Sequence, residues 1–148
     1  MKEIYQNNLF KYYFFNNCDN ILKDLELTKQ ECMFLIITYT LSEDNKHVLL
    51  KTIRERMEMS KPAISILMSK LEKKGYIKRH LNKNNLREIY VKLSEYSMKI
   101  AEETINRIDT QLSLITERMG KEKMDKLIEL NDLFSEISKI IIEEGASC

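Results

Sequence analysis

The segment from Ser60 to Gly75, SKPAISILMSKLEKKG, is the feature that most constrains the fold of this chain. Ser60 can cap a helix because its hydroxyl accepts from an otherwise unpaired N–H of the first turn. Pro62 suits that turn because its missing N–H costs nothing there, and Gly75 can take the left-handed conformation that ends a helix. The segment therefore predicts a short amphipathic helix whose apolar stripe is Ile64, Leu67, Met68 and Leu71.

The opposite face of this helix is small, polar and basic, and we expect it to enter the major groove of DNA. Serine hydroxyls can bond to base edges, small apolar side chains can meet thymine methyl groups, and lysines can reach phosphates or guanine. The candidate DNA-reading residues on this face are Lys61, Ala63, Ser65, Ile66, Ser69 and Lys70.

The segments on either side complete a DNA-binding plan. Residues 50–57 are predicted to form a helix and residues 58–60 a tight turn, which gives a helix-turn-helix. Beyond the second helix the apolar period changes from about 3.6 to about 2, so residues 76–81 and 87–93 are predicted strands joined by a turn at 82–85. A helix-turn-helix followed by such a hairpin is a winged helix.

Polar and cationic residues around the helix are candidates for the rest of the contact. Arginine is attracted to narrow minor grooves, and N–H groups at a helix start can bind phosphate. For Arg87 the alternative is an ion pair with Glu88 or a neighbouring acid. The candidate minor-groove residues are Lys83, Asn84, Asn85 and Arg87, and the candidate phosphate contacts are Lys51, Arg79 and the helix start at Ser60.

The net charge of +1 hides a strongly basic middle of the chain. Residues 49–93 hold 12 Lys and Arg against 4 Asp and Glu, whereas the remainder holds 12 against 19. Such asymmetry is expected where a polyanion is bound, although a solvated basic surface is the alternative. Together with the local motif, the charge pattern favours nucleic acid as the partner.

The N-terminal part is predicted to be helical. Residues 3–25 are predicted to form a helix that is apolar over much of its circumference and must be covered by a partner. Thr28 and Glu31 have the spacing of a capping box. The helix that follows, to about Leu41, is apolar nearly all round and should be central core, and residues 47–49 could form a very short strand.

The last third of the chain is predicted to be two long helices. Apolar residues recur at spacings of 3 and 4 from Met98 to Met119, which is a heptad seam, and Gly120 interrupts it. A second helix, from about Lys121 to Glu143, repeats the pattern. A helix of about 25 residues is roughly 37 Å long, too long for this small chain to cover alone. We therefore expect a homodimer interface, with an intrachain helical hairpin as the alternative.

The composition indicates the fold class and argues against a membrane or secreted protein. With 3 Gly and 1 Pro in 148 residues, the chain should be mostly helical, and no apolar run approaches the roughly 20 residues of a membrane span. The N-terminus lacks the apolar segment and cleavage site of a signal peptide, so we expect a cytoplasmic protein.

Catalytic and metal-binding classes find no support in the sequence. Cys18, Cys32 and Cys148 offer no close pair for a disulfide or zinc, and His47 and His80 lack clustered acids. No base, nucleophile or phosphate loop stands in a catalytic spacing. We therefore expect neither an enzyme nor a cofactor or metal site.

In this order of elements the chain resembles the multiple antibiotic resistance regulator (MarR) family of bacterial winged-helix repressors. The residues that carry the resemblance are Leu27-Thr28 before the second helix and the segment from Ser60 to Ile77, especially LEKKGYI at its end. Arg87 with Leu93-Ser94 is similar to the family pattern in which a wing arginine precedes a Leu-Thr helix start by six residues.

The resemblance implies a mainly α fold with a small β-hairpin wing, and a dimeric transcriptional regulator, expected to be a repressor. It implies binding of double-stranded DNA at a pseudo-palindromic operator through helix 60–75 and wing 78–92. It further implies release by a small-molecule effector held between the dimerisation helices and the winged domain. The expected organisation is a single MarR-like domain, 1–148, with its winged helix-turn-helix part at 28–93 and helical dimerisation parts at 1–27 and 94–148.

The chain departs from the family pattern at several positions. The wing reads Asn85-Leu86-Arg87 where the family usually has Asp-x-Arg, which removes a carboxylate that could hold the arginine. Ile66 occupies a position that is often basic, Arg54 one that is often small, and Glu58 one in the turn that is often glycine. A winged-helix protein-interaction module without sequence-specific DNA binding is therefore an alternative, although the cations of residues 49–93 favour DNA.

Cys18 supplies a further alternative, a redox-sensing regulator. Some relatives oxidise a first-helix cysteine next to tyrosines, and Tyr12 and Tyr13 are near in this sequence. A reactive cysteine needs a basic neighbour or a helix N-terminus, whereas Cys18 is expected in the middle of a helix beside Asp19. A buried core cysteine is the preferred interpretation.

Overall fold

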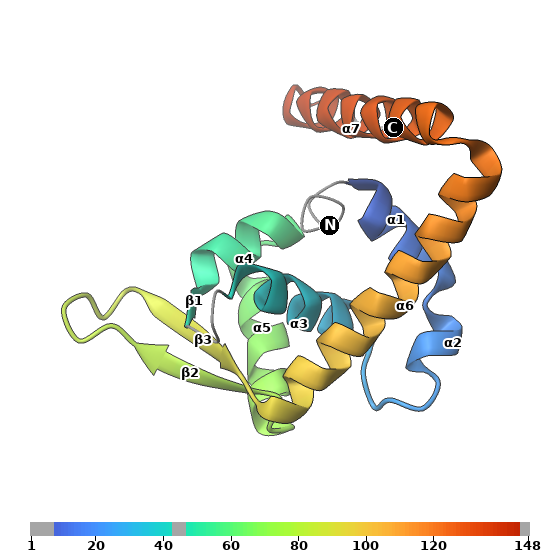
Figure 1. Ribbon diagram of the computed structural model, residues 1–148. Helices are drawn as coiled ribbons and strands as arrows, with labels where there is room; N and C mark the ends of the chain where they lie inside the picture. Colours follow the sequence, from blue (N-terminus) through green and yellow to red (C-terminus); the bar gives the residue numbers. More distant parts are fainter. Residues whose placement is uncertain (1–7, 43–46, 146–148) are drawn as a thin grey trace. The chain divides into compact units, whose positions relative to one another are not determined.

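The computed structural model describes residues 8–42 and 47–145 of the chain. They form helices and one small three-stranded antiparallel sheet (Figure 1). The described residues pack as two compact units, one within residues 21–107 and the other formed by those up to residue 20 together with those from residue 108 onward. Within the described part, no helix is both long and apolar enough to cross a membrane.

The centre of the unit 21–107 is helix α3, Lys29–Leu41. It begins at the predicted capping box, in which the N–H of Glu31 donates to Thr28 Oγ1 at 3.1 Å and the N–H of Thr28 donates to Glu31 Oε2 at 3.4 Å. Its residues from Glu31 to Thr38 are all buried. The prediction of a core helix that ends at Leu41 is confirmed.

Helices α4, Leu50–Met57, and α5, Lys61–Lys73, form the predicted helix-turn-helix. Ser60 caps α5, since its hydroxyl accepts from the N–H of Ala63 at 3.3 Å. Gly75, with φ of +82°, ends the segment in the left-handed conformation that the sequence predicts. The residues of the apolar stripe of α5 are all buried, as expected: Ile64, Leu67, Met68 and Leu71.

The sheet contains strands β1, Val48–Leu49, β2, Ile77–Leu81, and β3, Ile89–Leu93, in the order β1-β3-β2. Alternation places one face of the sheet toward the helices, where Val48, Ile77, Val91 and Leu93 are buried. Strands β2 and β3 with the turn between them form the wing, which extends to one side of the helices (Figure 1). The short strand at 47–49 and the hairpin are thus confirmed.

The first helix is shorter than expected. Helix α1 spans Asn8–Asn17 and a short helix α2 spans Asp19–Leu22, so the prediction of one helix over residues 3–25 is wrong at its C-terminal end. The side-chain amides of Asn16 and Asn17 donate to the carbonyl oxygens of Tyr12 and Tyr13, a local bond that favours helix ends over helix interiors. Residues 3–7 lie outside the described residues.

The break between these helices falls on Cys18. The residue is therefore not in the middle of a helix, as the sequence had indicated, but between two helices, and it is buried.

The second unit contains α1, the end of helix α6, Glu95–Met119, and helix α7, Lys121–Glu143. Helix α1 joins both of its neighbours by hydrogen bonds: the N–H of Asn8 donates to Asp132 Oδ1 at 3.1 Å, and Tyr13 Oη donates to Gln111 Oε1 at 2.9 Å. Gly120, with φ of +92°, separates the two long helices at the predicted residue.

Candidate nucleic-acid interface

Helix α5 presents the predicted reading face to solvent. Of its six candidate residues, five are exposed and Ala63 is half-buried, and Ile66 keeps 59% of its surface exposed. The hydroxyl of Ser69 donates to the carbonyl oxygen of Ser65 at 3.0 Å, which leaves the Ser69 oxygen available as an acceptor. The hydroxyl oxygen of Ser60 accepts the capping bond from the N–H of Ala63, which leaves its O–H available as a donor to phosphate beside the N–H groups of the helix start.

A cationic groove lies between α5, α4 and the wing. It is a hollow of about 410 Å³ whose lining brings Lys51 and Arg54 of α4 together with Lys61 of α5 and Arg87 of the wing. Ser65 of the reading face borders the same hollow. Three cations proposed from different parts of the sequence therefore meet at one place, and Arg54 joins them.

The single carboxylate in the lining of this cationic groove is held by the wing. Glu88 Oε2 accepts from Asn82 Nδ2 at 2.9 Å and from Tyr90 Oη at 3.4 Å. Among the described residues, no ion pair involves any of the four cations of the groove. The expected alternative for Arg87, an ion pair with Glu88 or a neighbouring acid, is therefore not formed, and the groove carries an excess of positive charge.

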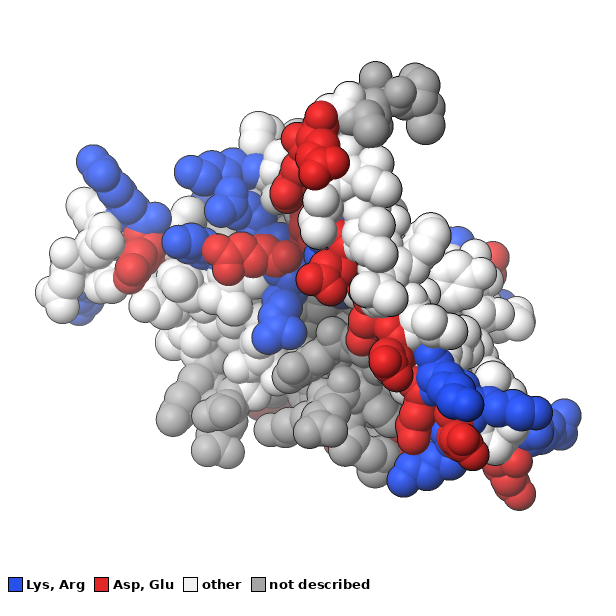
Figure 2. Space-filling model, turned by 90° about the horizontal axis from the view of Figure 1, so that it is seen from above, with Lys and Arg blue, Asp and Glu red and all other residues white. Residues whose placement is uncertain are grey.

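A second hollow borders the other side of the reading face. It has a volume of about 570 Å³ and lies between the start of α3 and the residues Ala63, Ile66 and Lys70 of α5. Lys29 and Gln30, at the start of α3, line its far wall. The exposed face of α5 is thus bordered on both sides by hollows with basic side chains. Figure 2 shows basic side chains, with acidic ones among them, over the wing and α4 at the left of that view.

The wing tip is shaped by asparagine side chains. Asn82 Oδ1 accepts from the N–H of Asn84 at 2.9 Å, and Asn85 Oδ1 accepts from the N–H of Arg87 at 3.1 Å. Asn85 therefore orders the backbone of Arg87, although the family's carboxylate is missing here. Lys83, Asn84, Asn85 and Arg87 are all exposed.

Arg79 lies apart from the groove. Its Nε is 3.6 Å from Glu72 Oε2, so this arginine is joined to α5, and a phosphate would have to compete with that carboxylate.

Sequence reasoning missed Arg54 as a candidate contact. It was noted only as a departure from the family pattern, yet it follows Lys51 by three residues on α4. Residues three apart on a helix lie on the same side, so this spacing was the signal that could have found it. Lys29 and Gln30 gave no such signal, because their place beside α5 depends on the tertiary fold.

The two histidines, which are distant in the sequence, meet in the structure. The ring centroids of His47 and His80 are 4.3 Å apart on the outer face of the sheet. Burial lowers the pKa of His47, and His80 and Lys92 lower it further because their positive charge opposes its protonation. Within the described residues, no group of three or more His, Cys, Asp or Glu is placed to hold a metal ion.

Comparison with known proteins identifies the class of domain that the chain contains. Residues 34–95 match the family model of a winged helix DNA-binding domain, so the chain contains a winged-helix domain of that description. The structure is similar to S. aureus MepR in complex with DNA (TM-score 0.66, 16% identity, 91% of this chain and 93% of MepR). It is also similar to Streptococcus pneumoniae FabT in complex with DNA (TM-score 0.70, 14% identity, 89% and 92%).

The fold that the resemblance to the MarR family implies, a winged helix with long C-terminal helices, is confirmed by these structures. In sequence, the chain is 34% identical over 80 residues to the HTH-type transcriptional regulator FarR of Neisseria gonorrhoeae, a stretch that covers 54% of this chain. The chain spans about half the length of this curated relative, 53%.

Proposed function

We propose that this protein is a dimeric transcriptional regulator, with repression as its expected mode, that binds a pseudo-palindromic DNA operator. The observation that carries this proposal is the cationic groove, where Lys51, Arg54, Lys61 and Arg87 gather beside the exposed face of α5. The relative FarR is named as a transcriptional regulator, and the similar structures of MepR and FabT contain DNA.

The two parts of the surface would divide the work of recognition. Ser65, Ile66 and Ser69 on α5 would read base edges in the major groove, and Arg87 with the asparagines of the wing would follow the adjacent minor groove. The cationic groove between them would hold the phosphate backbone, which positions the protein without reading sequence. Arg79 would add little, because it is already paired with Glu72.

The dimer part of the proposal is supported by the surface of α7. Leu130, Phe134 and Ile142 keep between 62% and 73% of their surface exposed, and Leu133, Ile137, Ile140 and Ile141 keep close to half. Soluble proteins rarely expose so large an apolar face unless a partner covers it. A second copy of the chain would cover it and would place two α5 helices on two half-sites of DNA. Residues 1–27 and 94–148 would then form the dimerisation part.

A small-molecule effector is a further part of the proposal. It is supported by the neighbour NadR, which was solved in complex with 4-hydroxyphenylacetate and shares the fold with a TM-score of 0.63 at 24% identity. Binding of DNA would place the protein in the cytoplasm. No observation favours the interaction-module alternative, and the burial of Cys18 gives no support to redox sensing.

The proposal is tested by the salt dependence of duplex binding. Wild-type protein should bind its selected duplex with a sub-micromolar Kd that weakens steeply with salt, because each phosphate contact releases counterions. Arg87→Ala and Lys61→Ala should each weaken binding and lower the salt slope, whereas Lys123→Ala, in the first turn of α7, is the control and should change neither. If Arg87→Ala and Lys61→Ala leave affinity and slope unchanged, the DNA-binding account fails.

A further inference from the structure

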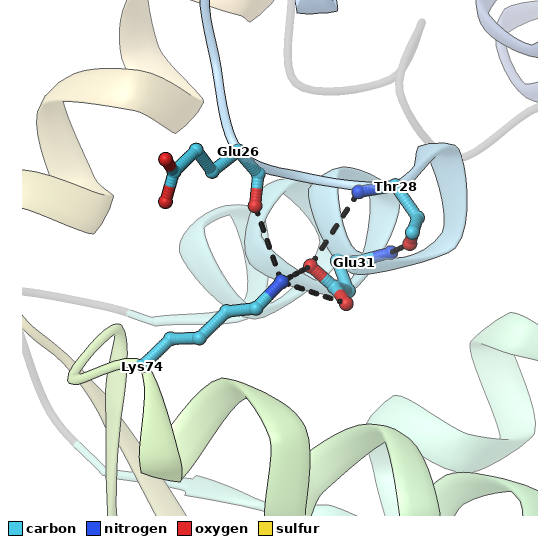
Figure 3. Close-up of polar contacts among 4 residues, drawn as sticks. All are labelled: Glu26, Thr28, Glu31 and Lys74. Atoms are coloured by element: carbon cyan, nitrogen blue, oxygen red, sulfur yellow. Dashed lines mark hydrogen bonds and ion pairs between the residues drawn. The ribbon is translucent and has the colours of Figure 1, made fainter.

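The C-terminal end of α5 is tied to the start of α3 by one lysine. Lys74 Nζ donates to Glu31 Oε2 at 2.9 Å, to Glu31 Oε1 at 3.2 Å and to the carbonyl oxygen of Glu26 at 3.1 Å (Figure 3). An ammonium group has three N–H donors, and here three acceptors surround it. All three N–H donors of Lys74 are therefore used in bonds within the protein. From the sequence alone, its place beside Lys73 would suggest a phosphate contact instead.

The partner of Lys74 is a buried carboxylate. The side chain of Glu31 is 3% exposed, and that of Lys74 is 39% exposed. A buried charge is costly unless it is paired and hydrogen-bonded. Glu31 meets both conditions at once, since it also accepts from the N–H of Thr28 in the capping box (Figure 3). The same carboxylate thus starts α3 and holds the end of α5.

The contact between Glu31 and Lys74 lies at the C-terminal end of α5, where it can fix the direction of the helix axis. Lys74 is the C-cap of α5, and Gly75 follows with a left-handed φ that leads into the wing. A helix of 13 residues is about 20 Å long, so a small displacement at one end tilts the whole reading face. The other end is held by its cap, by the short turn from α4 and by the burial of Ile64.

We propose that Glu31 and Lys74 are positioning residues for DNA recognition: they fix the direction of α5 without touching DNA. This inference rests on the proposed function. It predicts that loss of the pair lowers the ratio of operator to non-specific affinity, because base contacts require a precise helix direction. Phosphate contacts tolerate a small tilt better, so the salt slope should stay the same.

The double variant Glu31→Gln/Lys74→Met tests the proposal most cleanly. It removes one negative and one positive charge, so the net charge, and with it the long-range attraction to DNA, does not change. Glutamine at this position can still complete the capping box, so α3 keeps its start. Single Lys74→Met would instead leave a buried carboxylate without its cation and destabilise the fold.

The readouts are binding of a selected operator and of a random duplex, each over a range of salt, together with thermal unfolding. We expect the operator-to-random affinity ratio of the double variant to fall about fivefold, with an unchanged salt slope. Lys73→Met is the control: Lys73 is exposed beside the contact of Lys74 with Glu31, so its loss should leave the ratio unchanged.

An unchanged ratio in the double variant overturns the proposal, even if its thermal stability falls. If the double variant does not fold, Glu31→Gln alone decides, because it keeps Lys74 and the capping box and removes only the carboxylate charge. A fall in operator affinity then supports the positioning role, because the added net positive charge alone would strengthen binding of both duplexes, and an undiminished operator affinity refutes it. Failure of the wild-type protein to bind any duplex would instead refute the proposed function itself.

Discussion

Glu58 shows how a single residue in the helix-turn-helix carries strain. It is the one non-glycine residue with positive φ among the described residues, with φ of 58° and ψ of 38° at the C-cap of α4. The left-handed conformation costs an L-residue about 1–2 kcal/mol because its Cβ comes too close to the following carbonyl oxygen. Glycine has no Cβ and adopts this conformation without that cost. The MarR family often has glycine at this position of the turn. The positive φ of Glu58 gives the physical reason for that preference.

Glu58→Gly should therefore stabilise the fold. Glycine relieves the strain but loses more conformational entropy on folding, so the expected net gain is about 0.5–1 kcal/mol in the free energy of unfolding. Chemical denaturation measures it. Glu58→Ala is the matched control, since it removes the carboxylate but keeps the Cβ and the strain. Equal stability of the glycine and alanine variants would contradict the strain argument.

At the scale of the elements, the sequence predicted most boundaries because local chemistry sets them. The capping box at Thr28, the cap at Ser60 and the glycines at 75 and 120 place helix ends where the structure has them. The break at Cys18 was missed, because it has no Pro or Gly and depends on asparagine side chains that bond to the preceding turn.

Some residues of the candidate site could be predicted from local sequence, and the roles of others depend on the tertiary fold. The exposed face of α5 followed from helical spacing alone. The roles of Arg79 and Lys74 depend on carboxylates of other elements, Glu72 of α5 and Glu31 of α3, which spacing on one element cannot reveal. Arg54 became a candidate only when α4, α5 and the wing were seen to enclose one groove.

The groove makes a prediction for α4. Arg54→Ala should weaken duplex binding and reduce the slope of log K against log salt by about 0.9, the value for one phosphate contact. Arg56→Ala is the control, because Arg56 lies on the same helix and does not line the groove. Binding isotherms at several salt concentrations give both slopes. Equal effects of the two substitutions on affinity and slope would show that DNA binding depends on the overall charge of the protein, and would contradict a specific phosphate contact of Arg54.

At the scale of the whole molecule, the exposed apolar face of α7 predicts a dimer. Phe134→Glu places a charge in that face, since Phe134 is 73% exposed, and should convert the dimer to a monomer in sedimentation experiments. Operator affinity should fall by at least about tenfold, because the two half-sites are no longer bound together. Glu136→Gln, two residues from Phe134 and so pointing away from that ring, changes one charge of α7 and should remain dimeric. A wild-type protein that sediments as a monomer would contradict this part of the proposal.

Binding-site selection from random duplexes tests the central claim most directly. Two α5 helices related by a two-fold axis should enrich a pseudo-palindrome whose half-sites lie about 10 base pairs apart, centre to centre. Substitution of Ser65 or Ile66 should change the enriched bases within each half-site but not their spacing. Enrichment of a single half-site, or of no sequence at all, would contradict the account of this protein as a dimeric, sequence-reading regulator.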